Sequence, residues 1–565
     1  MTHTPHTEDT PSPDEVARVW LGDLYSALED GRSLDELQTF EALLAEAPDG
    51  QERTALVARG RVIATVMPAL WEYSTTFQAL RMAGLQLPAL SEIQGHWQAL
   101  GSRLMAMSSA WKRALAEAPA ELRQAVLDHP EIQPLRPQLD FQLRDVATAD
   151  DPRGRLRPAG PDLWRGMVTA IDGSFSTTLD GRKLGAGEAD AMARAHPQEA
   201  TRRTLSEARE AHRVQWRDLW AQAIDARAVW LTLQSPEEGI RTALLNSRVS
   251  VETWEAINGA LLGGALGLAD RAHTLRETLT GMDVRQPWNR LVPFPSDRTT
   301  SLPLEEALDT ITQAFAVLGP DLSATVHQAR DNGWIERGAR PRKRTGAYMI
   351  PFARRIEPRL LITWGGTELD ALILAHELGH AHHLLAMKGL PFGRLVFPVA
   401  MSEMVSIFAE YLYRRHAHSA DAQRYALSQF DRYLVYIPTM VRFEQRVLRE
   451  RQGRPWTAQR LTALWLEVHE QAGCRAHPHG WCTWEQLSPT VLMRMGQVLG
   501  ALVSILFTDA FERDQQGFPA QLQGFLRDTG TLDMDEILQV HFGLDGRAPA
   551  TWHRALQLFG QSLAS

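Results

Sequence analysis

The sequence predicts a mostly α-helical protein of two lobes, with one small β-sheet beside a long helix of the second lobe. Two observations carry this expectation. Apolar residues recur at helical spacing along most of the 565 residues, whereas residues 358–364 form a short apolar run that is typical of a strand. Gly365 and Gly366 end that run, and a helical pattern begins directly after them. A helical body with a single small sheet follows from this distribution.

The first part of the chain indicates a tail followed by a helical lobe. Residues 1–14 are polar and rich in proline, which is typical of a disordered tail and not of a signal peptide. Residues 15–150 carry amphipathic helical patterns and are expected to form the N-terminal lobe. A stretch rich in proline and glycine over 149–161 marks the boundary, so the second lobe is assigned to 160–565.

Several stretches of the second lobe indicate helices. Residues 197–233 predict a long charged helix that begins at a proline. Two apolar runs, 260–269 and 498–507, are too short to span a bilayer and are expected to be buried helices. No membrane segment is therefore predicted.

Charge and cysteine content narrow the partners and the compartment. The net charge of -9 argues against nucleic acid as the main partner, because phosphate binding requires a basic surface. Two cysteines in a chain of this length fit a reducing compartment. We therefore expect a cytoplasmic protein whose partners include neither nucleic acid nor a membrane.

The motif His376-Glu377-Leu378-Gly379-His380 is the main functional signal of the sequence. Positions four apart lie about one turn apart on the same face of a helix, so both imidazoles can bind one metal ion. A glutamate beside the first histidine then lies close enough to act on a water that the metal activates. This arrangement is typical of zinc metallopeptidases, and a pair of solvated helix histidines is the alternative.

The flanking sequence favours a helix over 367–388 that carries the motif. Thr367 and Asp370 are spaced as a capping box, and the Asp370 carboxylate in the first turn is favoured by the helix dipole. The helical pattern stops at 389–391, where a glycine and a proline occur. The two histidines are therefore expected on one face of a capped helix.

A second helix, indicated over 401–415, supplies the candidate for the third metal ligand. A catalytic zinc takes three protein ligands and leaves the fourth position for water. Glu403 is the candidate, and Glu410, two turns later, is its rival. His382 and His383 follow the motif directly, but their spacing from the second motif histidine does not place them on its face, so they are expected to be ordinary supporting or surface residues.

Taken together, these motifs resemble oligoendopeptidase F of the thimet oligopeptidase family of zinc metallopeptidases. In that family the second helix carries a glutamate that binds zinc, a serine three residues later and a second glutamate seven residues later. Glu403, Ser406 and Glu410 match this pattern, so the last two are expected to support the ligands. The resemblance implies a two-lobed helical metallopeptidase with a deep channel that admits short peptides. It rests on residues 345–348, 366–370, 374–380 and 403–410, with weaker similarity over 235–241 and 525–530.

The motif and the resemblance predict a zinc endopeptidase that hydrolyses internal bonds of short peptides. One Zn²⁺ per chain would be held by His376, His380 and Glu403, with Glu377 as the general base on the zinc-bound water. The strand that ends at Trp364 is expected to pair with extended substrate backbone. A zinc carboxypeptidase of the same clan and a catalytically impaired peptide-binding relative remain the alternatives.

One feature departs from the family. The family places a histidine and several tyrosines in its C-terminal part, where they bind the tetrahedral intermediate, but this chain has no tyrosine after Tyr436. Such a donor is worth about 3–4 kcal/mol, so its loss would slow the reaction. His477 or His479 is a candidate for the missing donor, and Tyr348 is a candidate for a substrate contact.

Both cysteines of the chain, Cys474 and Cys482, flank these two histidines. Cysteine and histidine at this spacing suggest three arrangements: a second metal site, a disulfide, or a loop whose thiols are reduced. The spacing is not that of a standard zinc finger, and the reduced loop is favoured.

Overall fold

The computed structural model describes residues 12–562, apart from 86, 88–89, 145–159, 234–235, 293, 295–300, 339, 341–342, 345, 452, 484–486 and 488–493. Most of the expected tail over 1–14 and of the expected boundary over 149–161 lies outside the described residues.

The first helix begins earlier than the sequence predicts. α1 (Pro13–Leu21) includes positions 13 and 14, which were assigned to the tail. Ser12 and Glu15 form a capping box in which each side chain accepts a hydrogen bond from the backbone N–H of the other. The tail prediction is therefore wrong at these two positions, because proline is well tolerated in the first turn of a helix.

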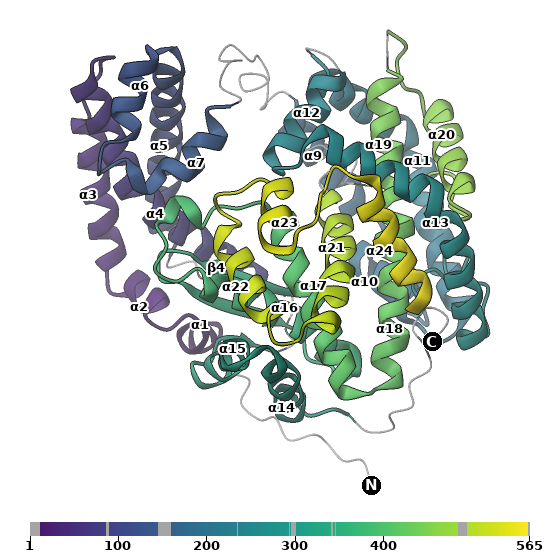
Figure 1. The fold of residues 1–565 in the computed structure, drawn as a ribbon. Coiled ribbons are helices and arrows are strands. Elements are labelled where there is room, and N and C mark those ends of the chain that lie inside the picture. Colours follow the sequence, from purple (N-terminus) through teal and green to yellow (C-terminus); the bar gives the residue numbers. More distant parts are fainter. Residues whose placement is uncertain are drawn as a thin grey trace.

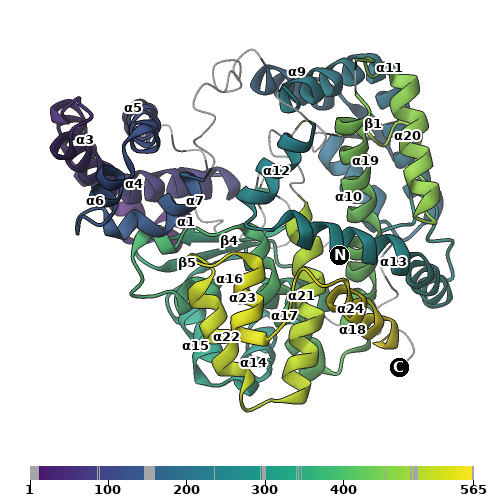
Figure 2. The same cartoon turned by 45° about the horizontal axis from the view of Figure 1, so that its top comes forward.

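Two helical arms stand on opposite sides of a helical base (Figures 1 and 2). The N-terminal arm holds α1, α2 (Asp23–Glu29), α3 (Arg32–Glu46), α4 (Arg53–Met82), α5 (Ser91–Glu117), α6 (Ala120–Leu127) and α7 (Arg136–Gln142). The second arm holds α9 (Pro161–Gly173), β1 (Ser176–Leu179), β2 (Arg182–Gly185), α10 (Ala186–Ala195), α11 (Glu199–Leu231), α12 (Pro236–Asn246), α13 (Val251–Thr280), α19 (Ile437–Arg449) and α20 (Ala458–Gln471).

The base contains the sheet and the two helices that carry the motif residues. It holds α14 (Leu304–Phe315), α15 (Pro320–Asp331), β3 (Ile335–Glu336), β4 (Ala347–Phe352), β5 (Glu357–Ile362), α16 (Glu368–Ala386), α17 (Val399–Ala417), α18 (Ala420–Asp431), α21 (Met495–Arg513), α22 (Phe518–Asp528), α23 (Met534–Phe542) and α24 (Pro549–Ser562). A π-helical turn, η6 (Arg432–Tyr436), joins α18 of the base to α19 of the second arm. The prediction of a mostly α-helical fold is confirmed.

The sheet of the base has the strand order β3-β5-β4. β5 is the central strand, paired in parallel with β3 and antiparallel with β4. The prediction that the strand ending near Trp364 pairs with substrate is therefore wrong, because both edges of β5 are occupied. β4 is an edge strand of this sheet, and Pro351 is tolerated there because an edge strand need not use the N–H that a proline lacks.

A second sheet, formed by β1 and β2, contradicts the expectation of a single sheet. The two strands are an antiparallel hairpin whose loop is Asp180-Gly181, and both loop residues have positive φ, 50° and 77°. Asp-Gly is the loop that a two-residue hairpin turn favours, because both central positions need a left-handed backbone. The Asp-Gly turn signal is present in the sequence between Thr178 and Arg182. The strands on either side of it are only four residues long, so the hairpin was not predicted.

The apolar run over 498–507 lies inside α21, a helix of 19 residues. By length and composition alone, the whole helix α21 could cross a membrane, whereas the run over 498–507 by itself is too short. Among its buried residues, Val498, Leu502 and Phe507 belong to the main hydrophobic cluster, as predicted for a buried helix. A core helix of this kind passes the same test of length and hydropathy.

Two glycines let α17 lie in backbone contact with α16 on one side and with α21 on the other. A methyl group built on Gly379 of α16 would lie 2.8 Å from the Cα of Ser406 and 2.9 Å from the Cβ of Ala409. A methyl group built on Gly500 of α21 would lie 2.6 Å from the Cβ of Glu403. The close crossing therefore needs residues without a Cβ at both positions.

Gly379→Ala should destabilise the fold by about 1–3 kcal/mol, because the added methyl group has no space and forces α16 and α17 apart. Chemical denaturation would measure this loss. The matched control is Gly101→Ala in α5, where nothing lies within 4 Å of the added Cβ. That change should stabilise the protein by up to about 1 kcal/mol through helix propensity. Equal effects of the two substitutions would show that the crossing is not tightly packed.

Candidate metal centre

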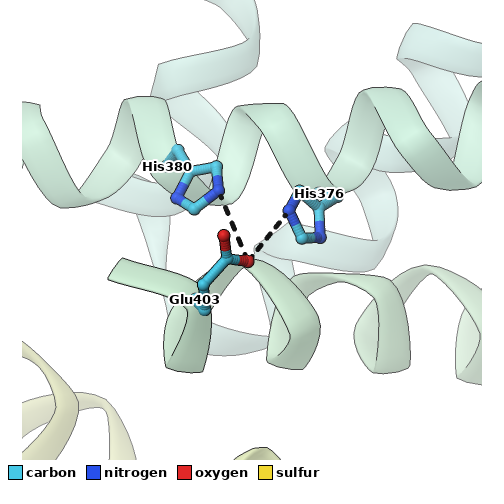
Figure 3. A group of neighbouring side chains, drawn as sticks. All are labelled: His376, His380 and Glu403. Atoms are coloured by element: carbon cyan, nitrogen blue, oxygen red, sulfur yellow. Dashed lines mark ion pairs between the residues drawn. The ribbon is translucent and has the colours of Figure 1, made fainter. Parts of the chain in front are cut away.

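The three ligands predicted from the sequence meet between α16 and α17 (Figure 3). His376 and His380 lie one turn apart on α16, and their Nε2 atoms are 3.5 and 3.9 Å from Oε2 of Glu403 on α17. One ligand atom from each of the three residues lies within 4.8 Å of the others. In the described part of the chain, this is the one group of three histidine, cysteine or acidic residues placed to hold a metal ion.

The second nitrogen of each imidazole is already engaged. Nδ1 of His376 lies 2.6 Å from Oε1 of Glu410, and Nδ1 of His380 lies 2.7 Å from Oγ of Ser402. Such partners fix the tautomer and leave the Nε2 lone pair for a metal. Two imidazoles and one carboxylate are the ligand set of several catalytic zinc sites, so the residues present fit a zinc ion.

Glu410, the alternative candidate for the third ligand, therefore does not lie where it could bind the same metal ion. Glu410 contacts the far side of the His376 ring, whereas Glu403 faces both Nε2 atoms. The hydroxyl of Ser406 donates to the backbone oxygen of Glu403 at 3.1 Å and lies 3.4 Å from its Oε2. Ser402, which the sequence analysis did not single out, is placed to orient the second histidine.

Burial and neighbouring charges shift the ionisation of the ligands. Burial lowers the pKa of His376, but hydrogen bonds with Glu403 and Glu410 outweigh burial and hold that pKa well above its ordinary value. Burial raises the pKa of Glu403, but the hydrogen bond with His376 and the charges of both histidines bring it down to about 2. Burial lowers the pKa of His380 to about 4. Glu403 is thus an anion and His380 a neutral imidazole at neutral pH.

Glu377 lies in the same cavity and contacts the free-edge strand of the sheet. Its Oε2 accepts a hydrogen bond from the backbone N–H of Met349 in β4 at 2.6 Å. Burial, as the largest cause, raises the pKa of Glu377 to about 7. A carboxyl group with a pKa near neutrality can both accept and return a proton, which is what a general base of a hydrolase must do.

A cavity of about 450 Å³ opens onto the three ligands and Glu377. Tyr348 lines it, as expected for a substrate contact, and the guanidinium of Arg344 lies 4.6 Å from the centre of the Tyr348 ring. Further polar residues that the sequence analysis missed also line it, among them Tyr425, Arg432 and Tyr433. They come from α18 and η6, more than 40 residues after the motif, and no spacing pattern connects them to it.

The structure does not bring His477 and His479 to this cavity. Nε2 of His477 lies 2.7 Å from Oγ of Ser206, and Nδ1 of His479 lies 2.9 Å from Oε1 of Glu210, both on α11 of the second arm. Neither histidine lines the cavity that holds the ligands. The geometry therefore gives no support to their predicted role as donors to the reaction intermediate.

The cysteines near these histidines are free thiols. Cys482 is buried and Cys474 is half-buried, and no disulfide joins them. The disulfide alternative is therefore wrong, and within the described residues these four side chains do not form a metal group. The favoured reading, a loop with reduced thiols, agrees with both facts.

The two histidines that follow the motif are interior residues. Nδ1 of His382 lies 3.1 Å from Oγ1 of Thr325, and Nε2 of His383 lies 2.9 Å from Oγ1 of Thr529. Burial lowers the pKa of His383 to about 3, so this imidazole is neutral. Of the two expected positions, supporting or surface, the surface position is wrong, since both side chains are buried.

The helical arms, the small sheet and the histidine-glutamate site define a mostly α-helical protein with one candidate metal centre. No model of a known protein family matches the chain. Its sequence is similar to oligopeptidase PepF of Bacillus subtilis, at 23% identity over 40% of this chain and 35% of that protein. It is also similar to an oligoendopeptidase F homologue of Lactococcus lactis, at 22% identity over 54% of this chain and 50% of that protein. The chain thus matches half or less of the length of these relatives.

Solved structures share the fold over nearly the whole chain. The crystal structure of oligoendopeptidase F from Enterococcus faecium superposes with a TM-score of 0.65 at 12% identity, covering 95% of this chain and 98% of that one. The structure of PZ peptidase A with an inhibitor superposes with a TM-score of 0.73 at 13% identity, covering 94% and 97%. Part of the sequence and nearly the whole fold of this chain are thus similar to those of oligoendopeptidase F and related peptidases.

Proposed function

We propose that the chain is a zinc-dependent endopeptidase that hydrolyses internal bonds of short peptides. The observation that carries the proposal is the meeting of His376, His380 and Glu403 beside Glu377 at the wall of one cavity. The names of the similar proteins support a peptidase that acts on oligopeptides. The site would hold one Zn²⁺ per chain, and we place the protein in the cytoplasm because its two thiols are free.

When bound, zinc supplies Lewis acidity, which polarises the scissile carbonyl and lowers the pKa of water. Glu377 takes the proton from the attacking water and returns it to the leaving nitrogen. The hydrogen bond from Met349 holds one carboxylate oxygen of Glu377 and leaves the other for this exchange. Glu410 and Ser402 keep the two imidazoles in the orientation that presents Nε2.

The free edge of β4 is the surface that would hold substrate backbone. The N–H of Met349 points away from β5, because it donates to Glu377. Since backbone groups of an antiparallel strand alternate between its two edges, Ala347 presents its N–H and C=O on the same side as Met349. An extended peptide that pairs there lies beside Glu377 and needs no particular side chains for its affinity.

We assign the binding of the oxygen of the tetrahedral intermediate to the hydroxyl groups of Tyr425 and Tyr433. Both line the cavity, and both are buried or partly buried, where a hydrogen bond to a developing negative charge is strongest. Burial raises the pKa of each phenol, so each keeps its proton to donate. They would replace the C-terminal tyrosines that the chain lacks.

The zinc carboxypeptidase alternative gains one observation. An enzyme that removes C-terminal residues needs a cation for the free carboxylate, and Arg432 lines the cavity. Among the described residues its recorded ring contact is with Tyr433, at 5.9 Å, and no carboxylate pairs with it. A peptide-binding protein without activity is the other alternative, and Tyr425 and Tyr433 argue against it.

One assay separates these functions. A mixed library of short peptides, incubated with the zinc-loaded protein, should yield fragments cut at internal bonds, and peptides with amidated C-termini should be cut as fast as free acids. Mass spectrometry of the products measures both. Release of single C-terminal residues, abolished by amidation, would establish the carboxypeptidase, and intact peptides throughout would establish the inactive relative.

A further inference from the structure

A second cavity lies in the second arm, among α9, α10, α11, η6 and α20. It encloses about 610 Å³, more than the cavity at the metal centre. None of the residues that line it also lines the cavity at the metal centre. The two cavities approach each other at η6, where Tyr433 faces the metal centre and Tyr436 faces the second cavity.

The second cavity is positively charged, although the whole chain carries a net charge of -9. Two aspartates line it, Asp172 and Asp190, against five arginines. A cationic enclosure of this size in an acidic protein concentrates anions. The five arginines are Arg194, Arg209, Arg213, Arg290 and Arg475.

Both aspartates form ion pairs with Arg209. It is 6% exposed, and its guanidinium lies 2.6 Å from Asp172 and 2.9 Å from Asp190. Its Nη1 is nevertheless buried without a hydrogen-bond partner. A buried donor without a partner costs free energy, which a ligand or an ordered water in the cavity would recover.

Arg213 and Arg290 are less fully paired than Arg209. The nearest recorded carboxylate oxygen to Arg213 is Oε2 of Glu210, 3.9 Å away, and the other oxygen of that glutamate accepts from His479. Nε of Arg213 is buried without a partner. Within the described residues, Arg290 donates to the backbone oxygen of Arg475 and stacks on the ring of Tyr436 at 4.4 Å. Neither contact neutralises its charge.

We propose that this cavity binds a small, multiply charged oxyanion, one that carries phosphate or carboxylate groups. Guanidinium groups pair with both kinds of group through two parallel hydrogen bonds. Arg209 forms the buried floor of the site, and Arg290, together with the loosely paired Arg213, supplies the positive charge that binds the anion. The ligand lies against Tyr436, three residues from Tyr433. Such an anion has two sources, a free phosphate compound or the acidic end of a peptide.

Calorimetric titration of the full-length protein tests the site with two probes, pyrophosphate and triglutamate, at constant ionic strength. Each probe that binds should do so at one site per chain, and the comparison of the two identifies the source. Arg213→Gln and Arg290→Gln should each raise the dissociation constant about tenfold or more, because each removes charge-assisted hydrogen bonds. Arg217→Gln is the matched control, one turn from Arg213 on α11 and outside the cavity.

A second control separates this site from the metal centre. His376→Ala should bind the probe as the unmodified protein does, since that residue is absent from the second cavity. Loss of binding in His376→Ala would place the anion on the metal and overturn the proposal. Equal affinity in Arg213→Gln, Arg290→Gln and Arg217→Gln, or no binding of either probe, would overturn it too.

Discussion

Replacing Glu377 by glutamine should lower kcat by a factor of about 100 to 10,000, because an amide cannot accept the proton of the attacking water. The zinc content should stay at one ion per chain, since Glu377 is not among the three residues that meet at the metal centre. The glutamine oxygen can still accept the hydrogen bond from Met349, so the cavity should keep its shape. Peptide cleavage rates and metal analysis of the same preparation would check both results.

A matched control is Glu368→Gln, on the same helix two turns earlier. Glu368 pairs with the hydroxyl of Tyr413 and does not line the cavity. Its loss should leave kcat nearly unchanged. If Glu377→Gln keeps most of its activity while Glu368→Gln does not, the base has been assigned to the wrong glutamate.

The second large effect concerns the third ligand. Glu403→Ala should remove the carboxylate that faces both Nε2 atoms, and bound zinc should be lost on dialysis against a weak chelator. Glu410→Ala should lower zinc affinity by about 10- to 100-fold only, because Glu410 orients His376 without facing its Nε2. Metal content after dialysis at graded chelator concentrations ranks the two variants.

Ser406→Ala serves as the control, since its hydroxyl contacts Glu403 and not the histidines. A small loss of zinc affinity is expected there. Glu410→Ala losing more zinc than Glu403→Ala would transfer the ligand role to Glu410, as the sequence alternative allowed.

The helices of the metal centre were predictable because their signals are local. The expected spans 367–388 and 401–415 correspond to α16 and α17, within two residues at each end. The capping box of Thr367 and Asp370 is present, with each side chain accepting from the other's backbone. Residues four apart on a helix share a face whatever surrounds them, so the histidine pair followed from geometry alone.

The remaining site residues depend on how distant segments pack. Tyr425 and Tyr433 reach the cavity because α18 packs against α16 and η6 packs against α21, which no sequence pattern reveals. The opposite error occurred for His477 and His479. They lie in the expected region of the chain, yet their loop packs on α11 of the second arm. Position along the chain is a poor guide to position in space when the connecting helices are long.

The contact of α16 with α17 at Gly379 fixes the distance between the two helices that carry the metal centre. The distance between the two helices is set by main-chain atoms that touch, and not by side chains that can repack. On the far side, Gly500 holds α21 against Glu403 in the same way. An ion larger than zinc must therefore be accommodated by movement of the ligand side chains and not by separation of the helices. Gly379 and Gly500 therefore fix the spacing of the helices, and this spacing limits the size of the ion that the site can hold.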